Sequence, residues 1–132
     1  MVVWLLGKLL FYGAMATLAI AMLRLYLKNP FGFVLLYTFV RFLLGVFAGL
    51  LIWYAWEKLH GIGEVERYAL SFGAFRYVEW VAVLALIALH QRTSIWEMRW
   101  RGQFWVLIGV AGNILLDRIA IWTGLTNVRF YC

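Results

Sequence analysis

Four long apolar stretches, separated by short polar connections, dominate the sequence. They cover residues 2–23, 31–56, 68–89 and 103–125. Each has roughly the 20 residues that a helix needs to cross the hydrocarbon core of a bilayer. Within the stretches, apolar residues do not alternate with polar ones as they do in the strands of a membrane barrel. The pattern therefore predicts four transmembrane helices.

The connections contain residues that favour turns. Pro30 closes the first connection and suits the first turn of the second helix. Gly61 and Gly63 mark the second connection, and the third is the polar segment HQRTSIWEMRWRG. Connections this short make sequential helices antiparallel neighbours. We therefore expect an all-α integral membrane protein, with a single transmembrane domain over residues 1–132, four helices in an antiparallel bundle and no soluble domain.

The composition agrees with a membrane location. Hydrophobic residues make up 66% of the chain and charged residues only 14%, whereas a soluble domain is about half apolar and about a quarter charged. The net charge of +6 would suggest nucleic acid as a partner of a soluble protein. Here the basic residues mostly lie at the ends of the apolar stretches, where they meet lipid headgroups. We expect membrane lipid as a partner and no nucleic acid.

Basic residues in the connections predict the orientation, because they are concentrated on the inner side of a membrane. The first and third connections carry five of them and the second carries two, namely Arg24, Lys28, Arg92, Arg99 and Arg101 against Lys58 and Arg67. This places the first and third connections inside and both termini outside, in a bacterial inner (plasma) membrane. Aromatic residues near the helix ends are expected at the two interfaces, among them Trp4, Trp96, Trp100, Trp105 and Trp122.

Charged side chains interrupt the apolar stretches. A charge at the bilayer centre costs roughly 2.5–3.5 kcal/mol, so such residues usually face protein or water and are paired. In the stretch AFRYVEW, Arg76 and Glu79 lie three residues apart and share one helix face. Asp117 and Arg118 lie at a matched depth on the next helix, and Lys8 lies near the same level. We expect at least one of the pairs Arg76–Asp117 and Glu79–Arg118 to form.

Together with Asn113, which shares a helical stripe with Asp117, these residues form a candidate intramembrane cluster. Its role is either structural, as a lock between helices, or in transport. Arg41 has no evident acidic partner in the chain, so it either extends toward the inner surface or meets an acid on another subunit. Gly45 and Gly49 form a GxxxG pattern, which favours close packing of helices inside the bundle. Arg41, Gly45, Gly49 and Lys8 are possible contacts with partners.

Several kinds of chemistry find little support. His60 and His90 should lie at opposite membrane edges, roughly 30 Å apart, so one chain cannot hold a haem between them. His60 lies near Glu57, Glu64 and Glu66, but such a cluster is more often a solvated loop than a metal site. No Ser–His–Asp arrangement and no glycine-rich phosphate loop is evident, and the single cysteine, Cys132, cannot form an internal disulfide. No catalytic residue, cofactor or metal is expected.

The expected function is therefore that of a small non-catalytic transmembrane subunit. It would pack against other membrane protein subunits and assist the assembly or stability of a larger complex. The alternative is a small homo-oligomeric transporter or lipid flippase that uses the charge cluster, because ionisable residues within a membrane often line ion or proton pathways. An intramembrane enzyme has the least support in the sequence.

Overall fold

The computed structural model describes residues 2–56, 61, 63 and 73–124. These residues form helices and contain no strand. The helices are α1 (Val2–Met22), α2 (Pro30–Trp56), α4 (Phe75–His90) and α5 (Ile95–Trp122). The expectation of an all-helical chain is confirmed for this part of the protein.

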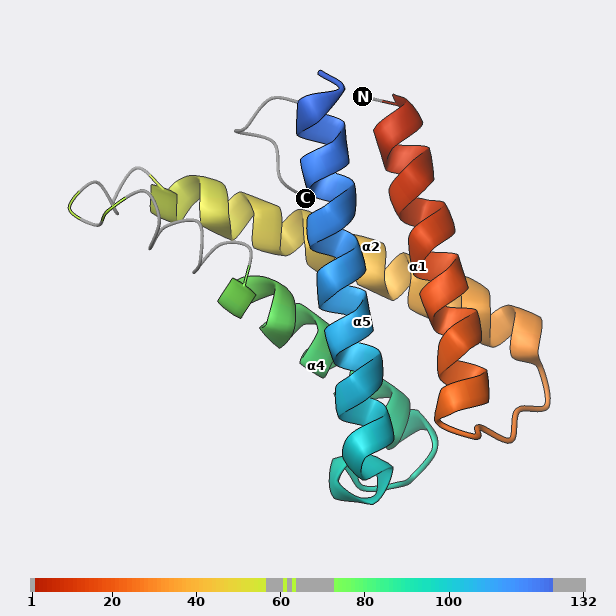
Figure 1. The fold of residues 1–132 in the computed structure, drawn as a ribbon. Helices are drawn as coiled ribbons and strands as arrows, with labels where there is room; N and C mark the ends of the chain where they lie inside the picture. Colours follow the sequence, from red (N-terminus) through yellow and green to blue (C-terminus); the bar gives the residue numbers. More distant parts are fainter. Residues whose placement is uncertain (1, 57–60, 62, 64–72, 125–132) are drawn as a thin grey trace.

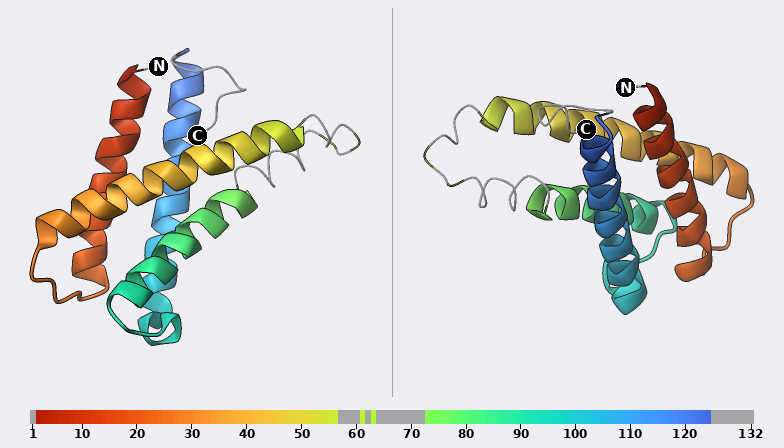
Figure 2. Two further views of the ribbon diagram at one scale, coloured as in Figure 1. Left: turned by 180° about the vertical axis from the view of Figure 1, so that it is seen from behind. Right: turned by 45° about the horizontal axis from the view of Figure 1, so that its top comes forward.

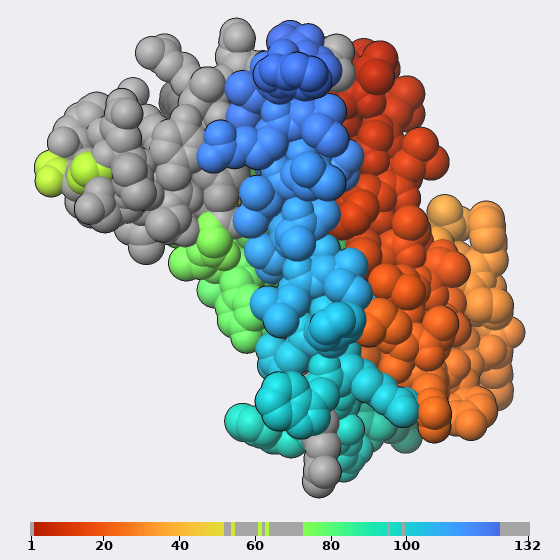
Figure 3. Space-filling model, in the orientation of Figure 1, coloured from red at the N-terminus to blue at the C-terminus, as the bar shows by residue number. Residues whose placement is uncertain are grey.

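The helices form two antiparallel pairs that cross each other. In Figure 1, α1 and α5 lie side by side and run in opposite directions, with α2 passing behind them. Figure 2 shows α2 and α4 as the second pair, seen from behind. Side chains of α1 and α5 fill the seam between the two helices in Figure 3. The arrangement is two crossing layers, whereas the sequence predicted one antiparallel bundle of four helices.

Three helices have the length and apolar character to cross a membrane. The spans are Val2–Met22, Pro30–Leu51 and Trp100–Trp122. The third predicted stretch gives α4, whose described part is 16 residues long. Residues 68–72 of that stretch lie outside the described residues. Membrane association is therefore supported by α1, α2 and α5.

Local sequence signals explain where two of the helices begin. Pro30 is the first residue of α2, and the Asn29 side-chain oxygen accepts a hydrogen bond from the Gly32 N–H at 2.9 Å. Ser94 and Glu97 form a capping box at the start of α5, which satisfies two backbone N–H groups reciprocally. Because of this cap, α5 begins at Ile95, eight residues before the apolar stretch that starts at residue 103.

Arginine occupies an unusual backbone position at the ends of α1 and α4. Arg24 and Arg92 both have φ of 53°, in the left-handed region where glycine is favoured. The N–H of the following residue bonds back to the helix in each case, Leu25 to Ile20 at 3.1 Å and Thr93 to Ala88 at 2.9 Å. These are the long bonds of the Schellman motif, which closes a helix C-terminus.

The interior is built around aromatic rings. Trp80 on α4 and Trp105 on α5 are each 1% exposed, and their rings meet edge to face with centroids 5.1 Å apart. The Trp105 indole N–H donates to the Met15 carbonyl oxygen on α1 at 2.8 Å. Trp4 is also buried. The expectation that Trp105 is an interfacial anchor was wrong, because its ring packs between helices, and the Trp4 ring is buried beside the Lys8 ammonium.

Candidate functional site: a buried network of ion pairs

The network begins within one turn of α4, where Arg76 and Glu79 lie three residues apart. The Arg76 Nη1 atom donates to both carboxylate oxygens of Glu79, each at 3.0 Å. Arg76 is 1% exposed and Glu79 is 5% exposed. The helical spacing places both side chains on the face that α4 turns toward the interior. The two charges in AFRYVEW therefore face protein.

Asp117 on α5 connects this pair to α1. Its Oδ2 atom lies 3.5 Å from Arg76 Nη2, and its Oδ1 atom lies 2.8 Å from Lys8 Nζ. The expected Arg76–Asp117 pair is thus present. Arg118, the partner expected for Glu79 in the other pair, has an exposed side chain.

Arg41 on α2 joins the network through Glu79. Its Nη2 atom donates to Glu79 Oε2 at 2.5 Å. The guanidinium also lies over the rings of Tyr12 and Trp80, with centroids at 4.8 and 4.9 Å, a geometry in which aromatic faces attract cations. The prediction that Arg41 lacks an acidic partner in this chain was wrong, and its contact with another subunit stays a prediction.

The contacts form one continuous chain of charges across all four described helices. It runs from Lys8 on α1 through Asp117, Arg76 and Glu79 to Arg41 on α2. Three positive and two negative groups give the chain a net charge of +1. Removing one partner of a buried pair leaves an uncompensated charge and costs about 3–5 kcal/mol. The network therefore ties the two crossing layers together.

Lys8 is also engaged inside the chain. Besides its bond to Asp117, the Lys8 ammonium lies over the Trp4 ring at 4.4 Å from the centroid. Trp4, Lys8 and Tyr12 follow one another at spacings of four residues, so they share one buried face of α1. Lys8 thus has its acidic partner within this chain, and its contact with another subunit stays a prediction. This helical spacing was visible in the sequence and would have identified Tyr12 as part of the site.

Some polar groups within the network and next to it have no hydrogen-bond partner. Asn113 is fully buried, and its Oδ1 atom accepts from the Tyr12 hydroxyl at 3.3 Å. Among the described residues, Asn113 Nδ2, Arg76 Nε and two nitrogens of Arg41 have no hydrogen-bond partner. Buried donors of this kind are costly. The site therefore holds more donors than its own acceptors satisfy.

Small residues allow the helices around the network to approach. Gly109 on α5 lies against Trp80, and a Cβ atom there would come within 2.5 Å of the indole ring. Gly112 lies against Phe11 in the same way, with a closest approach of 2.4 Å. On α2, Gly45 is buried and Gly49 is half-buried. These positions agree with glycine acting inside the chain, where it brings helix backbones close together.

The remaining candidate residues lie away from the network. His60, Glu57, Glu64 and Glu66 lie outside the described residues. His90 is exposed at the end of α4, where its ring lies near Phe33 and Tyr37 with centroids 6.3 and 6.0 Å away. Within the part of the chain that the structure describes, no group of three or more His, Cys, Asp or Glu side chains is placed to hold a metal ion.

Comparison with known proteins gives no family for this chain. It matches no protein-family model, and neither curated proteins nor solved structures contain a significant match. A functional assignment therefore depends on the residues and their arrangement.

Proposed function

We propose that all four helices of this protein lie within a membrane. The apolar spans of α1, α2 and α5 support this proposal, and α4 is bound to them by buried ion pairs. The five charged side chains of the network are buried, while large apolar side chains cover the outward face of α2. This arrangement has a low free-energy cost in lipid, because the charged groups contact other polar groups and the apolar side chains contact lipid.

The proposed location is a bacterial inner membrane, with both termini outside. The support is the excess of basic residues in the first and third connections. These connections lie at the same end of the molecule, where residues of both line a common pocket. The orientation can be measured with single cysteines introduced in the first and second connections and a thiol reagent that does not cross membranes.

Within the membrane, the proposed role is that of a small non-catalytic subunit that packs in a larger protein complex. The observation that carries this proposal is the outward face of the second half of α1. Ala14, Thr17 and Ala21 are exposed there at spacings of three and four residues. Lipid chains require no small side chains, whereas a partner helix needs them for close approach. The outward face of α2 is instead built from large residues, among them Leu36, Leu43, Phe47 and Leu50.

A matched pair of variants tests this role. Ala14→Trp places a large ring on the small face of α1, and Leu43→Trp places the same ring on the exposed face of α2. After gentle detergent extraction, native electrophoresis and mass spectrometry should find a different membrane subunit in fixed proportion to this chain. Ala14→Trp should release it and Leu43→Trp should not. A chain that migrates alone, or a complex that tolerates Ala14→Trp, would contradict the proposal.

The second candidate function is a homo-oligomeric transporter or lipid flippase. The unpartnered donors of Arg41, Arg76 and Asn113 favour it, since such donors can bind an anionic group. Reconstitution into liposomes separates the two functions. A transporter would move an anionic lipid or solute as an oligomer of this chain alone, and Arg41→Met would abolish the movement while the oligomer persists. An accessory subunit would show no movement above protein-free liposomes.

A further inference from the structure

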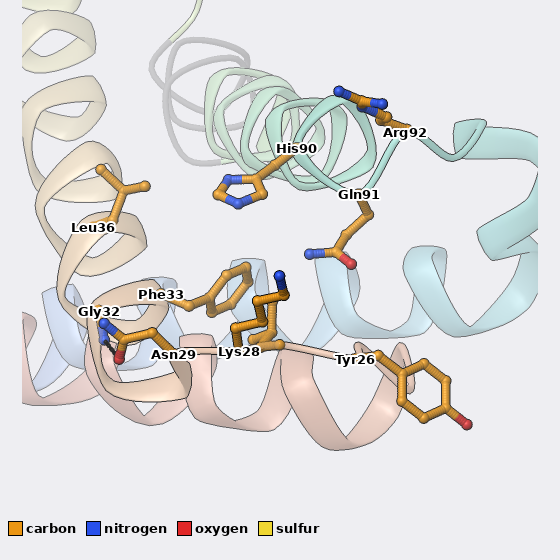
Figure 4. Close-up of a pocket in the computed structure, with 10 residues that line it drawn as sticks. Tyr26, Lys28, Asn29, Gly32, Phe33, Leu36, His90, Gln91 and Arg92 are labelled. Atoms are coloured by element: carbon orange, nitrogen blue, oxygen red, sulfur yellow. Dashed lines mark hydrogen bonds between the residues drawn. The ribbon is translucent and has the colours of Figure 1, made fainter.

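A pocket of about 490 Å³ opens where the first and third connections meet. Its walls come from the α1–α2 connection, the first turns of α2 and the end of α4. In Figure 4 the Lys28 side chain extends toward His90 and Gln91, and the Gln91 amide extends toward Lys28. Arg92 lies at the rim and its guanidinium points away from Lys28. Polar groups from two separate segments therefore converge on one space.

The electrostatics of the pocket favour an anion. Of the ten described residues that line it, Lys28 and Arg92 are basic and none is acidic. The positive end of α2 lies at the same place, because Asn29 caps the helix and Gly32 belongs to its first turn. That first turn contains no acidic residue. A helix N-terminus attracts negative charge through its dipole. The N–H groups of Gly32 and Phe33 already bond to Asn29, so the side chains around the pocket supply the donors.

Lys28 does not stabilise α2, the helix that it precedes. A cation next to a helix N-terminus is unfavourable, because both are positive. Arg92 differs, since it follows the C-terminus of α4, where a cation is favourable. No acidic side chain lines the space that Lys28 enters. A bound anion would relieve the repulsion between Lys28 and the first turn of α2.

The pocket continues into an apolar stripe on the outside of α2. Leu36 lines the pocket and is 47% exposed. Leu43, Phe47 and Leu50 follow it at spacings of seven, four and three residues, so they lie on the same face of the helix. All three are exposed. A ligand with a charged head and a long apolar tail matches a polar pocket that continues into an apolar stripe. A free anion would occupy only the polar pocket.

We propose that this pocket binds the phosphate group of an anionic phospholipid, with Lys28 as its principal cation. Gln91 and His90 add polar contacts, and the acyl chains lie along the stripe that starts at Leu36. The inference rests on the membrane location proposed above and is independent of the proposed role as a subunit. Basic pockets between helices at the inner side of a membrane protein are a recognised kind of lipid site.

Native mass spectrometry of the purified full chain in detergent provides the test. The chain is titrated with phosphatidylglycerol and, separately, with phosphatidylcholine, which has no net charge. Lys28→Gln is compared with Arg101→Gln, an exposed position outside this pocket that removes the same charge. Lys28→Gln should weaken phosphatidylglycerol binding about tenfold, as for the loss of one charge-assisted hydrogen bond. Arg101→Gln should weaken it several-fold less. Lys28→Arg, which keeps the positive charge, should bind phosphatidylglycerol as tightly as the unmodified chain.

Other outcomes would overturn the proposal. If Arg101→Gln weakens binding as much as Lys28→Gln, the attraction is diffuse and no pocket is involved. If phosphatidylcholine binds as tightly as phosphatidylglycerol, the charge is not recognised. If glycerol phosphate displaces the lipid at equal concentration, the site takes a free phosphate and not a lipid. The purified chain needs no partner subunit in this assay, so a failed search for a complex would leave the lipid result standing.

Discussion

Arg41 on α2 and Glu79 on α4 form an ion pair inside the protein, with 2.5 Å between Nη2 and Oε2. Glu79 also accepts from Arg76, so its carboxylate serves two guanidinium groups. Loss of the shared acid and loss of one arginine therefore have unequal consequences. Removal of Glu79 leaves Arg41 without an acidic partner and leaves Arg76 only Asp117, which it shares with Lys8, whereas removal of Arg41 leaves Glu79 paired with Arg76. This asymmetry gives the first prediction.

Glu79→Gln should destabilise the protein far more than Arg41→Met. The first change leaves Arg41 without a counter-charge and leaves Arg76 to share Asp117 with Lys8, so it should cost about 3–5 kcal/mol. The second removes the excess positive charge of the network and should cost less than about 2 kcal/mol, mainly through lost packing on Tyr12 and Trp80. Unfolding of the purified variants in mixed micelles measures both. Equal losses, or a larger loss for Arg41→Met, would show that the charge balance of the network does not govern its stability.

Gly109→Ala and Gly7→Ala should change stability in opposite directions. A Cβ at Gly109 would lie 2.5 Å from the Trp80 ring, whereas one at Gly7 would meet nothing within 4 Å. Gly109→Ala should therefore cost about 1–3 kcal/mol by overpacking. Gly7→Ala should add about 0.5–1 kcal/mol, because alanine favours the helix. Thermal unfolding with tryptophan fluorescence as the signal measures the difference, and a neutral Gly109→Ala would speak against the close approach of α4 and α5.

Ser94→Ala should loosen the first turn of α5 by about 1 kcal/mol, the typical contribution of a helix N-cap. The Ser94 hydroxyl accepts from the Trp96 N–H at 3.2 Å, and Glu97 completes the capping box. Hydrogen exchange at the amides of Trp96 to Met98 should become faster. Thr93→Ala is the control, since Thr93 is exposed and does not cap the helix. Unchanged exchange in Ser94→Ala would mean that the helix does not depend on this cap.

Arg24→Gly should stabilise the protein by roughly 1 kcal/mol. The residue has φ of 53°, which costs an arginine more than a glycine. Arg101→Gly is the control, because Arg101 lies within α5 and glycine there should cost about 1 kcal/mol. The free energies of unfolding of the two variants measure these effects. A destabilised Arg24→Gly variant would show that contacts of the arginine side chain outweigh the backbone strain.

Much of the network could be predicted from the sequence. Charges in apolar stretches are expensive in lipid, so their presence alone indicated that Arg76, Glu79 and Asp117 face one another. Counting residues along antiparallel helices placed Arg76 and Asp117 at one level, and the structure contains that pair. The cost of placing a charge in lipid therefore predicts that the site is a cluster of ion pairs.

The partner of Arg41 follows from the same count, although the pair was not expected. Arg41 lies ten residues after the start of the second apolar stretch, and Glu79 lies ten residues before the end of the third, so the two lie at one level on neighbouring helices. The count does not give the face that each helix turns toward its neighbours, which depends on how α2 and α4 cross α1 and α5 (Figure 2). Trp105 was misplaced for a different reason. Aromatic residues near a helix end suit both an interface and a core, and only packing distinguishes them.

The start of α5 has a mechanical consequence. The helix has 28 residues, about 42 Å at the usual rise per residue, and so exceeds a hydrocarbon core of about 30 Å. Trp96 and Trp100 are each 86% exposed near its beginning and lie one turn apart on one face, suited to the depth of the headgroups. In a thinner bilayer α5 must tilt further, and because α1 and α4 are ion-paired to it, they must tilt with it. The molecule would thus respond to hydrophobic mismatch as one rigid body.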